Sequence, residues 1–329
     1  MALARDGTPS DAQANALVFL IPIYNDWDAA QHLARDIDAL GLDAPVWLYF
    51  IDDASQQPRP STFGQEIRAD VNVLRLQTNL GHQKAIAVGL AYVHEHVAGV
   101  RAVVVMDGDG EDRPSDVPRL LEAFDAHDGQ QIVFAARAKR TEGTRFKVMY
   151  HVYKAVHRVA TGQGVKVGNF SVIPARYLPS LAVMSDVWIH YAAAVFKSKL
   201  PYAVVPADRG ERYAGKSKMN LSSLIVHGLS ALSVYSERIG VRMLEASAWI
   251  FGGLFLTLVG LFVASLIDPA VDAVGGAVLL GIAFVILLQF GLLALVFVFL
   301  TLGNRSRTTM LPIRDYAFFV EGCEAIHAD

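Results

Sequence analysis

Two aspartates separated by a single glycine follow a short apolar run in the first third of the chain. Asp107, Gly108 and Asp109 come directly after residues 102–106, which are Ala, Val and Met only. A near-continuous apolar run is typical of a buried parallel strand, and strand side chains at positions i and i+2 point the same way. We therefore expect both carboxylates to project from the carboxyl end of a strand, where such oxygen ligands suit Mg²⁺ or Mn²⁺. An Asp-x-Asp pattern alone is also typical of a solvated turn, so the prediction depends on its neighbours.

The chain around this pattern alternates between strands and helices. The expected strands are residues 16–23, 46–51, 71–76, 102–106 and 132–136, and the expected helices are residues 28–40, 82–97 and 116–127. Further along we expect helices at 145–161 and 186–199 and short strands at 170–173 and 202–205. This alternation predicts an α/β domain with a Rossmann-like, mostly parallel sheet covered by helices on both faces.

Two segments near the carboxyl end are strongly apolar. Residues 246–267 and 273–304 contain no Asp, Glu, Lys or Arg. Each is at least as long as the roughly 20 residues that cross a hydrocarbon core, so we expect a two-helix transmembrane hairpin. A buried helical hairpin in a soluble protein is the alternative, although runs of this length are uncommon in cores.

Basic residues flank this hairpin on both sides. Arg238 and Arg242 precede it, and Arg305, Arg307 and Arg314 follow it. By the positive-inside rule, both flanks and the α/β domain are expected in the cytoplasm, at the inner membrane of the cell.

Charge and cysteine content exclude several classes. The net charge is −3 and there is no long basic block, which argues against nucleic acid as a partner. Cys323 is the single cysteine, so we expect an ordinary thiol in a reducing compartment and no intramolecular disulfide.

Four further clusters accompany the two aspartates. They are Pro22-Ile23-Tyr24-Asn25-Asp26, Ile51-Asp52-Asp53-Ala54-Ser55, Asn79-Leu80-Gly81-His82-Gln83-Lys84-Ala85, and the basic loop from Arg209 and Arg212 to Lys218. Their order and spacing resemble family 2 glycosyltransferases of the GT-A fold. More narrowly, they are similar to the dolichyl-phosphate mannose synthase branch, whose bacterial members glycosylate undecaprenyl phosphate.

The resemblance implies a role for the acidic residues. Asp107 and Asp109 would hold Mg²⁺ or Mn²⁺, and Glu111 would add a ligand directly or through water. The branch usually has Gln at the position of Glu111, Ala at that of Gly108 and Glu at that of Asp26. An exposed loop carboxylate remains the alternative for Glu111, and a helix cap remains the alternative for Asp26.

The resemblance also implies which residues face the donor and the acceptor. The donor-binding residues would be Pro22, Tyr24, Asp26, Ile51, Asp53, Asn79, Lys84, Gly108 and Glu111. Besides Asp107 and Asp109, the catalytic residues would be the cations that meet the acceptor phosphate, namely Arg137, Arg212 and Lys218. The acceptor-side residues would be Arg140, Asn169, Asp186 and Trp188, with core packing as the alternative for Trp188 and solvation as that for Lys84.

The expected activity is transfer of one sugar, with inversion, from a nucleotide sugar to a polyprenyl phosphate at the cytoplasmic face. A UDP-hexose and undecaprenyl phosphate are the favoured substrates, and the product would need a separate flippase. An ionised lipid phosphate can attack without a general base. The alternatives are transfer to another lipid, with Asp186 as base, or to a polysaccharide, and a non-catalytic membrane scaffold. Self-association as a homo-oligomer stays open.

These expectations divide the chain into five parts. We expect a flexible amino terminus at residues 1–15, a GT-A catalytic domain at 16–220, an interfacial helix at 221–244, two transmembrane helices at 245–304 and a cytoplasmic tail at 305–329. Residues 221–244 fit a helix at the membrane interface or one packed on the catalytic domain equally well.

Overall fold

The computed structural model describes residues 15–137, 158, 167–213, 221–268, 270, 272–304 and 310–326. The chain forms two compact units. The first comprises residues 1–150, 165–234 and 310–329, and the second comprises residues 151–164 and 235–309. The expected amino-terminal segment and the helix expected at 145–161 fall almost entirely outside the described residues.

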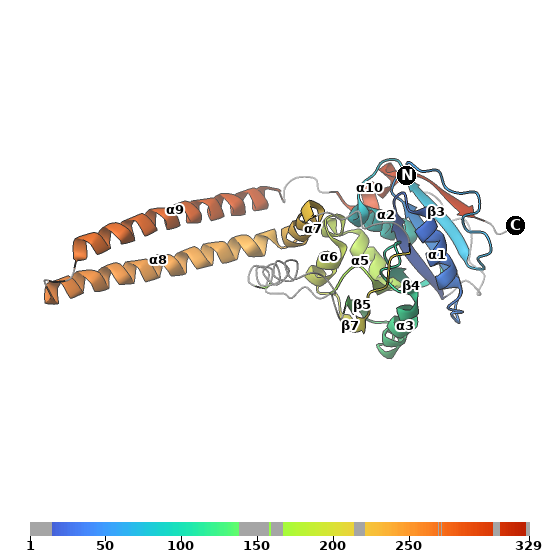
Figure 1. Ribbon diagram of the computed structural model, residues 1–329, viewed down its shortest axis with the longest axis horizontal. Helices are drawn as coiled ribbons and strands as arrows, with labels where there is room; N and C mark the ends of the chain where they lie inside the picture. The colour runs from blue at the N-terminus through green and yellow to red at the C-terminus, as the bar shows by residue number, and fades with distance from the viewer. Residues whose placement is uncertain are drawn as a thin grey trace. The chain divides into compact units, whose positions relative to one another are not determined.

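A mixed, mostly parallel sheet forms the centre of the first unit (Figure 1). Its eight strands follow the order β7-β5-β6-β4-β1-β2-β3-β8. The strands are β1 (Ala16–Ile23), β2 (Val46–Asp52), β3 (Asp70–Leu76), β4 (Val100–Val105), β5 (Ile132–Arg137), β6 (Ser171–Pro174), β7 (Tyr202–Ala207) and β8 (Val320–Ile326). Strand β1 pairs in parallel with both β2 and β4, and β2 pairs in parallel with β3. The predicted α/β fold with a mostly parallel sheet is confirmed.

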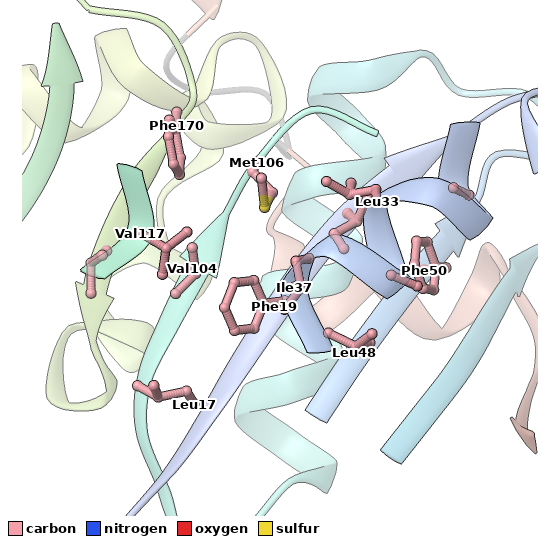
Figure 2. Close-up of a cluster of buried hydrophobic side chains, with 14 of the residues drawn as sticks. Leu17, Phe19, Leu33, Ile37, Leu48, Phe50, Val104, Met106, Val117 and Phe170 are labelled. Atoms are coloured by element: carbon pink, nitrogen blue, oxygen red, sulfur yellow. The ribbon is translucent and has the colours of Figure 1, made fainter. Parts of the chain in front are cut away.

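Helices cover both faces of this sheet. Helices α1 (Trp27–Asp38) and α3 (Val117–Ala126) pack on one face, and α2 (His82–His96), α5 (Leu178–Ala182) and α6 (Tyr191–Ser198) pack on the other. Figure 2 shows the first core, where Phe19 and Phe50 of the strands meet Leu33 and Ile37 of α1. Burial of each such side chain contributes about 1.5–3 kcal/mol, so the hydrophobic strand faces fix the sheet that carries the site.

The helix predicted at residues 186–199 is wrong as a single element. A short 3₁₀ segment covers Ser185–Trp188, and α6 begins only at Tyr191. His190 separates the two in an extended conformation, and its ring accepts a hydrogen bond from the backbone N–H of Ala193 at 3.4 Å. The backbone N–H of Tyr191, the first residue of α6, donates to the side chain of Gln83 on α2.

The segment expected as a tail contributes a strand to the catalytic sheet. After the short helix α10 (Pro312–Asp315), β8 pairs antiparallel with β3, from Val71 opposite Ile326 to Leu76 opposite Val320. Phe319 packs against Trp188, with ring centroids 5.3 Å apart. The chain therefore returns to the first unit after the two apolar segments.

The second unit contains two long helices packed on each other. Helix α8 (Ser236–Ile267) and helix α9 (Ala273–Asn304) are both long and apolar enough to cross a membrane. The two helices approach closely at Gly276 of α9, where a Cβ would lie 2.5 Å from the side chain of Leu261 of α8. Elsewhere the rings of Phe251 and Phe284 pack edge to face, with centroids 5.1 Å apart.

The helix expected at 221–244 is divided in the structure. Helix α7 (Leu221–Ser233) ends before Val234, and residues 236–244 belong to α8. Helix α8 therefore begins ten residues before the charge-free segment, and its first turns carry charged side chains.

Candidate active site

The candidate site lies where the strand order reverses. Strand β1 leads through α1 to β2 on one side, whereas β3 leads through α2 to β4 on the other side of β1. The carboxyl ends of β1 and β4 therefore flank a topological switch point, which is where open α/β sheets bind ligands. Asp26 follows β1, and Asp107 and Asp109 follow β4.

A single guanidinium joins the loops after these two strands. Nη1 of Arg212 lies 3.0 Å from Oδ2 of Asp109, and its Nη2 lies 2.7 Å from Oδ2 of Asp26. The three side chains are each only about one-fifth exposed, so the ion pairs are weakly screened by water. The structure thus brings together one predicted residue from each of three clusters that are distant in sequence.

A second arginine of the same segment pairs with the third acidic residue. Nη2 of Arg209 lies 2.6 Å from both carboxylate oxygens of Glu111. Backbone contacts hold the two segments together, because Arg209 forms an isolated antiparallel bridge with Asp112 and the N–H of Gly210 donates to the carbonyl of Glu111 at 2.8 Å. The expected role of Glu111 as a cation ligand is not supported by this arrangement, since its carboxylate is taken by Arg209.

Two glycines and a tyrosine make this close approach feasible. A Cβ on Gly210 would overlap the carbonyl oxygen of Gly110. Gly110 has a φ of +86°, and the ring of Tyr213 covers its α-carbon. The N–H of Tyr213 donates to the carbonyl of Asp109 at 3.1 Å, and its hydroxyl donates to Asp36 of α1. The sequence reasoning missed Tyr213, which anchors the basic segment.

The two aspartates after β4 repel each other electrostatically. Burial is the main cause that raises the pKa of Asp109, and the charge of Asp107 raises it further. The N–H of Glu111 and the guanidinium of Arg212 offset this only in part. A carboxylate pair in this condition favours a cation, which would neutralise both charges.

The residues fit a divalent cation bound jointly with a ligand. Among the residues that the structure describes, no three His, Cys, Asp or Glu side chains gather as a metal site. Mg²⁺ is usually bound by one or two carboxylates, with water and substrate phosphates completing its shell. Asp107 and Asp109 supply such a pair, whereas the three-carboxylate set with Glu111 is not formed.

Gly108 allows the aspartates to sit close to β1. A Cβ on Gly108 would lie 2.9 Å from Cγ2 of Ile23 and 3.0 Å from the carbonyl oxygen of Pro22. The Ala that the related branch carries would have to displace these atoms. Pro22 itself pairs in register with Ile51 of β2, so these two predicted donor residues lie side by side at the carboxyl ends of their strands.

Two predicted donor residues hold a loop beside the site. Asp53 is 4% exposed, and its two oxygens accept the N–H groups of Leu80 and Gly81 at 2.7 and 2.8 Å. The side chain of Asn79 donates to the carbonyl of Asp53 at 3.1 Å. Together they fix the turn at Gly81, whose φ is +88°, and so set where α2 begins.

An asparagine missed by the sequence reasoning ties the first two loops together. The carboxamide oxygen of Asn25 accepts the N–H groups of Gln56 and Gln57 at 2.8 and 2.9 Å. Its own N–H donates to Oγ of Ser55 at 2.8 Å. The loops after β1 and β2 are therefore held as one surface beside the candidate site.

On the other side, a hydrogen-bonded chain of side chains reaches Asp107. Nε2 of His82 lies 3.1 Å from Oδ1 of Asp107, and Nδ2 of Asn169 lies 2.9 Å from the same histidine nitrogen. Gln83 donates to Asn169 at 3.2 Å and accepts the N–H of Tyr191 at 2.7 Å. Asn169 is placed as predicted, but His82 and Gln83 were missed although they open α2 within a cluster already singled out.

The charge of His82 is set by its acidic neighbours. Desolvation is the largest effect on its pKa and lowers it, but the ion pair with Asp107 and the carboxylates of Asp112 and Asp109 together raise the pKa above its ordinary value. These carboxylates therefore favour the protonated form of His82 beside the aspartate pair.

The remaining predicted residues fall into two groups. Asp186 pairs with Lys197 at 2.8 Å, and Trp188 is 9% exposed in the core, so both stabilise the fold. Arg137 ends β5, Tyr24 and Lys84 are half-buried beside the site, and Arg140 and Lys218 lie outside the described residues.

Comparison with known proteins bears directly on this geometry. Residues 18–176 match the family model of glycosyl transferase family 2. The chain carries a family 2 glycosyltransferase domain. The predicted family is thereby confirmed, and the matched stretch contains most of β1 and all of β2 to β6, with Asp26, Asp107 and Asp109.

The family 2 domain has relatives among curated proteins. An uncharacterized glycosyltransferase of Bacillus subtilis, YkoT, is 24% identical over 67% of this chain and 67% of its own length. The undecaprenyl-phosphate 4-deoxy-4-formamido-L-arabinose transferase of Klebsiella pneumoniae is 25% identical over 63% of each chain. The chain thus spans about two thirds of the length of the relatives it matches.

Solved structures resemble the family 2 domain more distantly. Glucosyl-3-phosphoglycerate synthase from Mycobacterium tuberculosis, crystallised with Mn²⁺, UDP-glucose and phosphoglyceric acid, has a TM-score of 0.47 and 18% identity. That likeness covers 72% of this chain and 86% of the synthase.

Proposed function

We propose that this chain is a membrane-anchored, inverting glycosyltransferase that moves one sugar from a nucleotide sugar to a polyprenyl phosphate. The observation that carries the proposal is the position of Arg212 between Asp26 and Asp109 at the switch point of the sheet. Such a site offers carboxylates to a cation and a guanidinium to phosphate oxygens, which are the groups that a nucleoside diphosphate requires.

The chemistry follows from the charges of the two substrates. An oxygen of the lipid phosphate forms a bond to the anomeric carbon, and the bond from that carbon to the nucleoside diphosphate breaks, with inversion. A phosphate monoester loses its second proton near pH 6, so the attacking oxygen needs no protein base at neutral pH. A divalent ion, when bound, neutralises the charge that develops on the leaving diphosphate.

The chain's own residues position these groups. Asp107 and Asp109 would hold the cation, and His82 and Asn169 orient Asp107 through the contacts described above. Arg212 would exchange its carboxylate partners for phosphate oxygens when substrates bind, because the N–H groups of a guanidinium donate to both kinds of anion.

The route of the chain supports a membrane location. The chain leaves the first unit at residue 234, forms α8 and α9, and returns at residue 310 to complete the catalytic sheet with β8. Two crossings of a bilayer return a chain to the side from which it started. Arg238 and Arg242 precede the first apolar stretch, which favours the cytoplasm for that side and the inner membrane as the location.

The classes of acceptor, donor and cation are inferred from the relatives and from the chemistry of the site. The printed name of the Klebsiella pneumoniae relative specifies transfer to undecaprenyl phosphate, and this supports the same acceptor class here. A UDP-hexose is our candidate donor, and Mn²⁺ or Mg²⁺ our candidate cation. The lipid-linked sugar would then need a separate flippase to reach the opposite face.

A transfer assay in membranes tests the proposal. Membranes that contain the full chain would receive undecaprenyl phosphate, Mn²⁺ or Mg²⁺, and a panel of labelled UDP- and GDP-sugars. We expect one donor to give a lipid product that mild acid cleaves and that a chelator prevents. Nucleotide binding without a lipid product from any donor would overturn the acceptor class.

A further inference from the structure

Helix α7 presents two different faces. Ile225, Val226 and Leu229 are 48%, 61% and 59% exposed, whereas Ala231 is 6% exposed and Val234, directly after the helix, is 2% exposed. His227 is half-buried and lies about 200° around the helix from both Ile225 and Leu229. The helix therefore turns an apolar strip outward and a histidine inward.

The inward histidine meets the family 2 domain at a defined place. The rings of His227 and His190 are stacked at a tilt, with centroids 4.7 Å apart. His190 is 9% exposed and lies directly before α6. The backbone N–H of Tyr191, the first residue of α6, donates a hydrogen bond to the side chain of Gln83. Helix α7 is therefore seated against the start of α6 (Figure 1).

The same place is continuous with the candidate site. From Tyr191, the hydrogen bonds run through Gln83 and Asn169 to Asp107. His227 lies close enough to His82 and Asp107 for both charges to act on it, although burial is the main cause that lowers its pKa. A neutral imidazole at this position retains one N–H donor, which suits a phosphate oxygen.

We propose that His227 binds the phosphate of the lipid acceptor. This inference rests on the proposed function and names the part of the site that receives the acceptor. Helix α7 would lie at the membrane surface with Ile225, Val226 and Leu229 among the lipids, so that His227 faces the aspartate pair from the opposite side of the helix. His190 packs against the ring of His227 and holds it in place, so it is a positioning residue.

This arrangement would distinguish the acceptor phosphate from the donor diphosphate by its position as well as by its charge. The basic segment with Arg209 and Arg212 follows β7 and approaches the aspartates from that side, bridged to Asp112 of the loop after β4. His227 approaches from α6 and α7, beside the side of Asp107 that contacts His82. Donor and acceptor phosphates would thus meet different residues, and loss of His227 should affect only the acceptor.

Steady-state kinetics on the full chain in detergent test this inference. His227→Ala removes the donor group, and His227→Phe removes it while it keeps the volume of the ring. His127→Ala, at the exposed end of α3, is the matched control. With the nucleotide sugar saturating, we expect both His227 variants to raise the KM for undecaprenyl phosphate about 10-fold or more, the scale of a hydrogen bond to a charged group. The KM for the nucleotide sugar should not change.

The outcomes separate this inference from the function on which it rests. An unchanged acceptor KM in His227→Phe, or an equal rise in donor and acceptor KM, would overturn the role of His227 and leave the transfer activity standing. If the unaltered chain makes no lipid product, the proposed function falls and the inference falls with it. His227→Gln, which restores an N–H donor, should recover part of the acceptor affinity.

Discussion

Nη1 of Arg212 lies 3.0 Å from Oδ2 of Asp109, 103 positions away in the chain, and this ion pair joins the loop after β4 to the segment after β7. A carboxylate that can bind a cation is here neutralised by a side chain that can bind phosphate. On binding, the cation would contact Asp109 and the diphosphate would contact Arg212. Two contacts between opposite charges would then replace the single ion pair between Asp109 and Arg212. The structure therefore predicts that cation and nucleotide bind cooperatively.

The first prediction concerns Asp109. Asp109→Asn keeps the shape of the side chain but removes the charge, and we expect transfer to fall at least about 100-fold. Mn²⁺-dependent nucleotide affinity, measured by titration calorimetry, should fall with it. Asp125→Asn, an exposed aspartate paired with Arg101, serves as the control. Normal turnover of Asp109→Asn with a chelator present would rule out the cation site.

The second prediction separates Glu111 from the two aspartates. Because Glu111 is bound to Arg209, Glu111→Gln should leave transfer within about threefold of the unaltered chain, as expected of an ion pair with solvent access. Its dependence on Mn²⁺ concentration should also be unchanged. A loss as large as that of Asp109→Asn would instead make Glu111 a cation ligand.

The third prediction tests the docking of the basic segment. Gly210→Ala places a methyl group on the carbonyl of Gly110, so we expect the free energy of unfolding to fall by about 1–3 kcal/mol and transfer to fall about 10-fold. Gly322→Ala in β8 is the matched control, since a Cβ there has no atom within 4 Å. The same unfolding temperature and the same transfer rate in both variants would contradict docking of the basic segment onto the loop after β4.

The fourth prediction concerns the thiol of β8. Cys323 has an exposed surface overall, but desolvation at its sulfur raises the pKa of the thiol, and a hydrogen bond with Tyr92 offsets this only partly. A raised pKa leaves less thiolate at any given pH, so alkylation by iodoacetamide at pH 8 should be slower in the folded chain than in the urea-unfolded chain.

The pH profile of that reaction gives a second test. The alkylation rate should continue to rise above pH 9, the ordinary pKa of the thiol. Mass spectrometry of quenched samples would measure it. Equal rates in folded and unfolded chains across this range would mean that β8 does not hold Cys323 against Tyr92.

The strands of the family 2 domain could be predicted well from the sequence. Buried parallel strands such as β1 and β4 are continuous apolar runs, and their pattern does not depend on distant partners. Strand β8 could not be predicted in this way. It pairs with β3 at the edge of the sheet, where both of its faces are largely exposed, and its charged side chains hide the alternation.

The residue types of the candidate site could be predicted from the sequence, but the contacts between its acidic and basic side chains could not. The acidic and basic clusters indicated phosphate chemistry, yet the contact of Arg212 with Asp26 depends on the bridge between Arg209 and Asp112. The hydrogen bonds from the N–H groups of Leu80 and Gly81 to the carboxylate of Asp53 also could not be predicted, because these residues lie 27 and 28 positions further along the chain.

The place of β8 in the sheet has a consequence for biosynthesis. The ribosome makes residues 320–326 only after both long helices, so the edge of β3 stays uncovered until α8 and α9 have been synthesised. In a chain that crosses the bilayer twice, insertion of a single helix would leave the last strand on the wrong side. An open β3 edge could then pair with other chains. Under the membrane topology proposed above, completion of the sheet would make maturation of the enzyme conditional on correct insertion of the hairpin.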